Sequence, residues 1–128
     1  MSFLREPTII ARGKRWAVGY FSTETTAEWE DMNAGVKAKF QAKFDMLALN
    51  GRLHHPAMKK IKRTEAWEVE LKGKTGSDRA YRMQVEIEKL WLITHFGKTD
   101  HSQHQTLAAA RLAEQAFAEY MEFLNEAK

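Results

Sequence analysis

The chain has 128 residues, of which 44% are hydrophobic and 29% charged, a composition typical of a folded globular protein rather than a disordered one. It contains no cysteine, which excludes disulfides and thiolate zinc sites, and no apolar run approaches the roughly 20 residues of a membrane span. We therefore expect one cytoplasmic domain over residues 1–128. The net charge of +3 favours a polyanionic partner only where the positive charges cluster.

Residues 1–12 predict an irregular arm, and the residues that follow, up to residue 51, predict one strand and one or two helices. Residues 15–21 predict a strand in which Trp16, Val18 and Tyr20 share one face. A capping-box spacing begins at Thr25, and an apolar stripe with helical spacing follows up to Asn50-Gly51, a pair that favours a helix end. The segment is either one long helix or a helical hairpin with its break at residues 33–35.

Residues 52–63 form a basic segment that holds five arginine or lysine side chains and two histidines. Pro56 argues against a continuous helix here. Such a density of cations favours an anion-binding role, although a solvated basic loop is the plain alternative. His54 and His55 are adjacent and have no third ligand at a recognisable spacing, so we expect no metal site.

Residues 67–96 predict an antiparallel meander of three strands. Residues 67–71 and 81–87 alternate apolar and polar side chains, the pattern of half-buried strands. Residues 90–96 are apolar almost throughout, as in a strand that is covered on both faces. Between the first two strands, residues 72–78 are rich in turn formers.

A second capping-box spacing begins at Ser102 and precedes an apolar stripe that runs from Leu107 to Leu124, which predicts a C-terminal helix. The order of elements favours an α+β fold, with one antiparallel-rich sheet of about four strands and the helices packed on one face. The other face would be open and polar, and therefore available for binding. It would carry Glu68, Glu70, Arg82, Gln84 and Glu86.

Most aromatic side chains of these elements are predicted to be core. Trp29, Trp67 and Trp91 lie on apolar stripes, and His95 lies within the apolar strand, where we expect it to be hydrogen-bonded. Trp16 fits either the core or a platform on which a base stacks, and we expect the core.

Three strings carry a resemblance to a known family: MKKIK at 58–62 leading into WEVEL at 67–71, YRMQV at 81–85, and LITHFGKT at 92–99 ahead of a long amphipathic helix. In this order and separation they resemble the RelE/HigB toxin superfamily, most of all its phage-derived Gp49-like branch, over about residues 25–122. The resemblance implies a RelE-like fold and a toxin that cleaves messenger RNA, usually in the ribosomal A site. It also implies a cognate antitoxin partner and no metal or other cofactor. The products would be a 2′,3′-cyclic phosphate and a 5′-hydroxyl.

Cleavage by the 2′-hydroxyl needs a base, cations that stabilise the phosphorane, and an acid for the leaving oxygen. Arg82 and Lys62 match positions where members of the family carry an arginine and a lysine. Lys98 follows the last strand, where family members place catalytic or RNA-contacting cations. The candidate catalytic residues are Arg82, Lys62, Lys98, His101 and His104. The candidate RNA-binding residues are Arg52, Lys59, Lys60 and Arg63.

One departure from the family pattern concerns Glu68 and Glu70, which stand where RelE-type members place lysines. Either glutamate can serve as a base if its surroundings tune its pKa. Alternatively, the pair neutralises Arg82 and marks a site without activity. The second hypothesis is therefore a non-catalytic phage- or plasmid-derived module that binds protein or nucleic acid through the same face.

Overall fold

The computed structural model describes the chain except for its first residue, its last two residues and four short internal segments. The described residues are 2–53, 57–73, 76–85, 89–99 and 103–126. The strands are β1 (Phe3–Arg12), β2 (Ala17–Ser22), β3 (Met58–Lys60), β4 (Trp67–Gly73), β5 (Gly76–Val85) and β6 (Leu90–Thr99). The helices are α1 (Thr23–Glu30), α2 (Ala34–Asn50) and α3 (Gln103–Glu126). No helix within these ranges is long and apolar enough to cross a membrane.

All six strands belong to one mixed sheet in the order β1-β2-β6-β5-β4-β3. β2 and β6 run parallel, and every other neighbouring pair is antiparallel. The α+β class is confirmed, and the predicted meander corresponds to β4, β5 and β6. The expected number of about four strands is wrong, because the sheet has six. The two additional strands, β1 and β3, lie at the two edges of the sheet.

β1 lies in the N-terminal segment that was expected to be an irregular arm. It contains Pro7, which has no N–H to donate and is tolerated in a strand only at an edge or an irregularity. Both conditions hold, since β1 is an edge strand and its register with β2 shifts between Phe3 and Thr8. A proline that argues against a central strand is therefore compatible with this one.

Of the two possibilities for residues 26–49, the helical hairpin is the one observed. α1 begins after Ser22, whose side chain accepts a hydrogen bond from the Thr25 N–H, so the cap lies three residues before the expected one. Asn33 caps α2 by accepting bonds from the N–H groups of two following residues. Gly51 ends α2 in the left-handed conformation, with φ of 77°.

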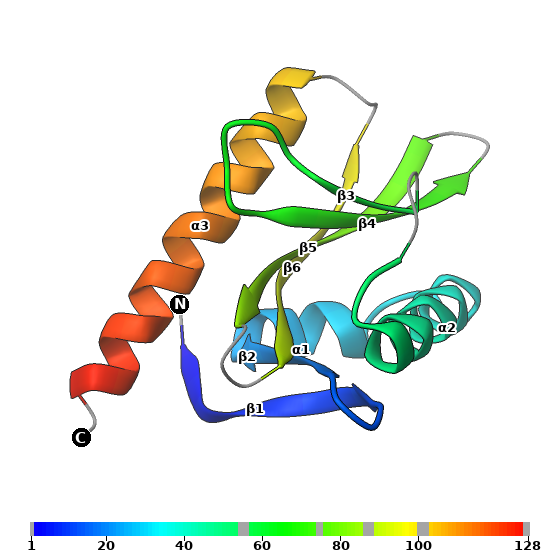
Figure 1. The fold of residues 1–128 in the computed structure, drawn as a ribbon. Helices are drawn as coiled ribbons and strands as arrows, with labels where there is room; N and C mark the ends of the chain where they lie inside the picture. Colours follow the sequence, from blue (N-terminus) through cyan, green and yellow to red (C-terminus); the bar gives the residue numbers. More distant parts are fainter. Residues whose placement is uncertain (1, 54–56, 74–75, 86–88, 100–102, 127–128) are drawn as a thin grey trace.

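The helices cover both faces of the sheet (Figure 1). α1 and α2 pack on one face through a cluster that includes Trp29, Phe40, Phe44, Leu47, Val18, Tyr20, Trp91 and Ile93. α3 packs on the opposite face through a cluster that includes Ala116, Tyr120, Phe21, Leu90 and Leu92. The prediction that all helices share one face and leave the other open is therefore wrong. In β6, alternate residues belong to the two clusters, as expected for its nearly continuous apolar sequence.

Candidate functional site

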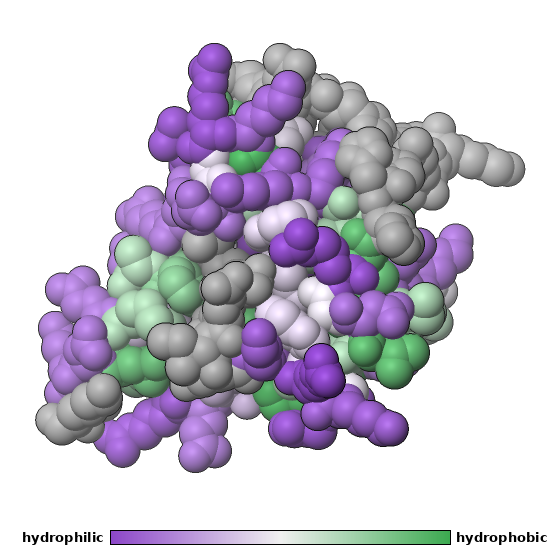
Figure 2. All heavy atoms as spheres, viewed as in Figure 1, coloured by the Kyte–Doolittle hydropathy of each residue, from purple (hydrophilic) through white to green (hydrophobic). Residues whose placement is uncertain are grey.

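A pocket of about 1060 Å³ lies at the β3 edge of the sheet. Its walls come from the residues that follow α2, from β3 and the turn after it, from β4 and β5, and from the first part of α3. Hydrophilic side chains gather over this part of the molecule (Figure 2). Six of the thirteen lining residues are cationic: Arg52, Lys59, Lys60, Lys62, Arg63 and Arg79. The pocket thus brings together all five cations of the basic segment.

The turn between β3 and β4 presents two of these cations from a well-ordered backbone. The N–H of Ile61 donates to the carbonyl of Ala66 at 3.0 Å, and the hydroxyl of Thr64 donates to the carbonyl of Ile61 at 2.8 Å. The Ile61 and Ala66 side chains are buried in a cluster with alanines of α3. Lys62 and Arg63 between them are exposed. Burial of both ends of the turn therefore fixes the place from which the two cations extend.

Arg63 adopts a φ of 69°, a conformation that is unfavourable for a residue with a Cβ atom. We expect Arg63→Gly to be more stable than Arg63→Val by about 1–2 kcal/mol, because both variants lose the charge but only valine keeps the steric conflict. Urea unfolding of the two purified variants measures the difference. Equal midpoints for the two would show that the turn does not hold this backbone conformation in solution.

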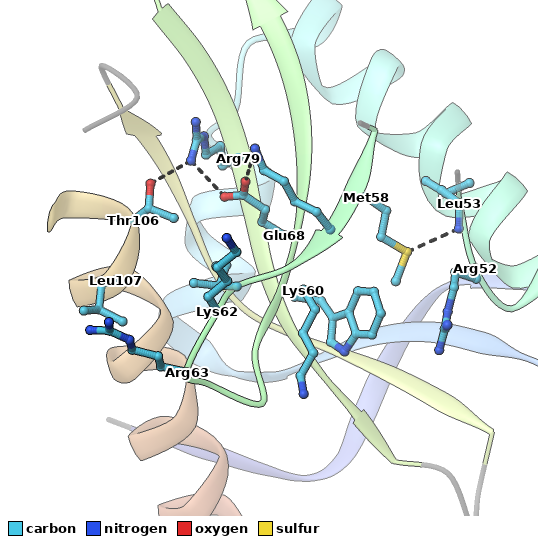
Figure 3. Close-up of a pocket in the computed structure, with 13 residues that line it drawn as sticks. Arg52, Leu53, Met58, Lys60, Lys62, Arg63, Glu68, Arg79, Thr106 and Leu107 are labelled. Atoms are coloured by element: carbon cyan, nitrogen blue, oxygen red, sulfur yellow. Dashed lines mark hydrogen bonds and ion pairs between the residues drawn. The ribbon is translucent and has the colours of Figure 1, made fainter. Parts of the chain in front are cut away.

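Glu68, the only acidic residue that lines the pocket within the described part of the chain, is fully buried and paired with two cations (Figure 3). Arg79 lies 2.9 Å from one of its oxygens, and the Lys59 Nζ lies 3.3 Å from the other. Arg79 also lies 3.0 Å from Glu70 and donates a hydrogen bond to the Thr106 hydroxyl of α3 at 2.9 Å. The two glutamates are therefore neutralised beneath α3, and the repulsion they would exert on a polyanion is reduced.

The strand register explains why Arg79, rather than Arg82, meets the glutamates. β4 and β5 pair so that Glu70 faces Arg79 and Trp67 faces Arg82. Because side chains alternate across a strand, Arg82 lies on the face of α1 and α2, opposite to Glu68. The prediction that Arg82 shares a polar face with the glutamates is therefore wrong.

Arg82 is fully buried. Its guanidinium carbon lies 5.1 Å from the centroid of the Trp91 ring. None of its three nitrogens has a hydrogen-bond partner among the described residues. Burial lowers the pKa of Arg82 to about 9. Arg82 is not among the described residues that line the pocket.

The remaining catalytic candidates, Lys98, His101 and His104, are only partly placed, whereas His95, expected in the core, is described. Lys98 lies in β6 with its backbone opposite Asp78, and His104 lies near the start of α3, but neither side chain is among those described. His101 lies outside the described residues. His95 lies in β6 with its Nδ1 3.1 Å from the hydroxyl of the preceding threonine, and burial lowers its pKa to about 4. His95 is therefore neutral at pH 7.

Two residues of the site were missed from the sequence. Trp67, expected in the core, is half-buried and lines the pocket. The sequence pattern does not single out Arg79, because residues 72–78 predict a turn and the next strand is expected to begin only at residue 81. The signal was available in the two glycines of that segment. Gly73 pairs with Gly76, and counting outward from this pair sets Arg79 opposite Glu70.

No three acidic or histidine side chains of the described residues gather into a group that could hold a metal ion. No protein-family model matches the chain, and no curated protein matches it in sequence. Among solved structures, the isolated E. coli RelE toxin aligns with a TM-score of 0.52 and 14% identity, over 82% of this chain and 99% of that one. A doubly substituted E. coli RelE in the free state aligns with a TM-score of 0.51 and 12% identity, over 87% and 98%. The chain therefore has a RelE-like fold.

Proposed function

We propose that this chain is a RelE-like toxin, an endoribonuclease that binds messenger RNA through the pocket at the β3 edge. The observation that carries the proposal is the convergence of five cations of the basic segment on one pocket, in which Glu68, the only acidic lining residue among those described, is buried and paired. Such a pocket favours a polyanion, since each cation can contact a phosphate and release its counterions. The class of polyanion, RNA, comes from the family resemblance of the sequence, and the alignment with a solved RelE toxin supports that resemblance at the level of the fold.

In this mechanism the exposed cations hold the RNA backbone and stabilise charge on the reacting phosphate. Lys62 and Arg63 extend into solvent from the ordered turn, and Lys60 lies beside them on β3. The 2′-hydroxyl loses its proton and attacks the adjacent phosphorus, and the P–O5′ bond breaks as the 5′-oxygen gains a proton. We assign stabilisation of the negative charge on the phosphorane to Lys62 and Lys98, and proton transfer to His101 or His104. No metal takes part in this scheme.

Glu68 has a positioning role in this proposal. It has no solvent exposure, and both of its carboxylate oxygens are held by cations. Its pairing with Lys59 fixes an ammonium group at the pocket wall, with 39% of the Lys59 side chain still exposed. Arg82, which the family resemblance places among the catalytic residues, would have to leave Trp91 before it could contact a phosphate.

Inducible expression in bacteria tests the proposal. We expect the wild-type chain to arrest growth and to produce new RNA ends that carry a 5′-hydroxyl, and we expect Lys62→Ala to lose both effects. Lys39→Ala is the matched control, because Lys39 is an exposed lysine of α2 outside the pocket. Normal growth and intact transcripts, with folded wild-type protein in the cell, would refute the nuclease.

The proposed partners are messenger RNA, the ribosome and a cognate antitoxin. Co-expression with the neighbouring open reading frame is expected to restore growth if that frame encodes the antitoxin. Ribosome dependence follows from where the new ends lie. Ends that keep one position within the reading frame, and that vanish when translation is blocked, indicate cleavage in the A site.

The second candidate is a non-catalytic module that binds RNA or protein through the same surface. Two observations favour it: Arg82 is buried, and no described histidine lines the pocket. It predicts RNA binding that weakens steeply with salt but leaves the RNA intact. Purified protein mixed with end-labelled RNA separates the two candidates, because only the nuclease shortens the labelled RNA. If the nuclease needs the ribosome, the RNA is shortened only when ribosomes are added.

A further inference from the structure

The pocket has a second wall with a different chemistry from its phosphate-binding cations. Trp67 lines it and is half-buried, and its ring packs edge-on against Trp91, with centroids 5.7 Å apart and planes at 77°. The exposed Arg52 lies over the Trp67 ring, with its guanidinium carbon 4.7 Å from the centroid. An aromatic face and a planar cation therefore lie together in the pocket.

Neighbouring contacts hold this wall in place. The Trp91 Nε1–H donates a hydrogen bond to the carbonyl of Gly51 at 2.8 Å, and Trp16 stacks on Trp91 with centroids 5.8 Å apart. Arg52 follows Gly51 directly, so the bond that fixes Trp91 also fixes the backbone from which Arg52 extends. The Trp67 face is thus preorganised, which lowers the entropy lost when a ligand stacks on it.

A phosphate-binding group lies beside the same face. Lys60 is paired with Trp67 in the register of β3 and β4, and 45% of its side chain is exposed. Its ion pair with the exposed Glu65, at 3.4 Å, is of the kind that contributes little in water. Figure 3 shows Lys60 and Arg52 directed toward one end of the pocket and the Glu68–Arg79 pair at the other. A phosphate can therefore take the place of Glu65 next to the aromatic face.

We propose that Trp67 and Arg52 form a stacking subsite for one unpaired nucleobase of RNA, with Lys60 on the adjoining phosphate. The inference rests on the proposed function and names its substrate class, single-stranded RNA. A planar base stacks on tryptophan and on guanidinium groups alike, and it does so only when it has left the base-paired stack. Duplex RNA presents phosphates to the pocket but no free base face, so it gains only the electrostatic part of the binding.

The test is binding of a short, fluorescently labelled, single-stranded RNA with 2′-O-methyl groups, which lacks the nucleophile and cannot be cleaved. We expect Trp67→Leu to bind it about ten- to a hundredfold more weakly than wild type, and Trp67→Phe to keep most of the affinity. Arg52→Gln, which keeps a planar group without the charge, should fall between them. Circular dichroism confirms that each variant is folded.

A competition experiment on the wild-type protein avoids any effect of substitution on folding. An abasic oligonucleotide of the same length has the same number of phosphates and no bases. We expect it, and a duplex of the RNA sequence, to compete about tenfold or more less well than the single strand. On Trp67→Leu the abasic and normal strands should compete equally.

The outcomes separate the subsite from the proposed function. Salt-dependent binding of RNA and abasic strand with equal affinity, unchanged in Trp67→Leu, would overturn the subsite and leave the phosphate-binding pocket intact. If the wild-type protein binds neither strand at low salt, both proposals fail. Tighter binding of duplex than of single strand would also overturn the subsite.

Discussion

Replacing Arg79 with methionine is expected to lower the free energy of unfolding by about 3–5 kcal/mol, the range found when one partner of a buried ion pair is removed. The Arg79 side chain is 3% exposed and bridges Glu68 and Glu70, which are 0% and 6% exposed as side chains. Without the guanidinium, Glu70 loses its cation, and Glu68 keeps only Lys59. Urea unfolding at pH 7 measures the loss.

A variant that also lacks both buried carboxylates separates electrostatics from packing. Arg79→Met combined with Glu68→Gln and Glu70→Gln removes the cation and both anions while keeping similar volumes. We expect this triple variant to recover most of the lost stability, because no unpaired charge stays buried. A triple variant as unstable as Arg79→Met would attribute the loss to packing. A loss below about 1 kcal/mol in the single variant would contradict the buried network itself.

The same ion pairs connect the sheet to α3, because Arg79 also donates to Thr106. Arg79 extends from β5, the glutamates from β4, Lys59 from β3 and Thr106 from α3. The fully buried side chains that α3 contributes to the cluster beside this network, Ala110 and Ala113, are small and bury little apolar area. The pocket wall therefore depends on a polar network for its shape.

The parts of the fold that depend on local signals were predictable. The helical hairpin follows from Asn33, which caps α2, and from Gly51, which ends it. The period-two alternation in β4 and the apolar run in β6 identified both strands. These signals lie within a few residues of the element they define, so a single sequence contains them.

The parts that depend on pairing between distant segments were not predictable. β3 has only three residues, and its strand conformation depends on β4, with Met58 opposite Val69. The face on which Arg82 lies depends on where the β4–β5 hairpin turns. The position of this turn is fixed by the pairing of the two strands, which continues to Gly73 and Gly76. The apolar stripe of α3 fits either face of a sheet, so its sequence does not indicate which one it covers.

The same distinction applies to the site. The density of cations in residues 52–63 indicated an anion-binding segment, and the hydrogen-bonded turn and the short β3 place its five arginine and lysine side chains along one pocket. Trp67 was expected in the core because alternation shows which face a side chain is on, not whether that face is fully covered. Near the short edge strand β3, the cover over Trp67 is incomplete.

Replacing Arg82 with methionine is expected to raise the free energy of unfolding at pH 7 by roughly 1–4 kcal/mol, the gain found when buried charges are replaced by apolar side chains. The guanidinium is fully buried and unpartnered among the described residues. Its contact with Trp91 offsets only part of the desolvation. Arg12→Met is the control, since Arg12 is exposed on β1 and its replacement should change stability by less than about 0.5 kcal/mol.

The pH dependence gives this prediction a second readout. The pKa of Arg82 is about 9 in the folded chain, well below its ordinary value, because burial disfavours the charged form. Above pH 9 the unfolded chain therefore binds more protons at this residue, and the wild type gains stability relative to Arg82→Met as pH rises. The advantage of the variant should be constant between pH 6 and about pH 8, and smaller at pH 10.5.

A less stable Arg82→Met variant at pH 7 would mean that the guanidinium is favourably bound where it lies, and the pH dependence would then be absent. A variant that is more stable but no longer arrests growth would show that Arg82 is unfavourable for folding and needed for activity. Arg82 would then be a residue that reduces stability and is kept for activity, as is common at functional sites. Together with the family resemblance, that outcome would indicate that Arg82 moves out from Trp91 when RNA enters the pocket.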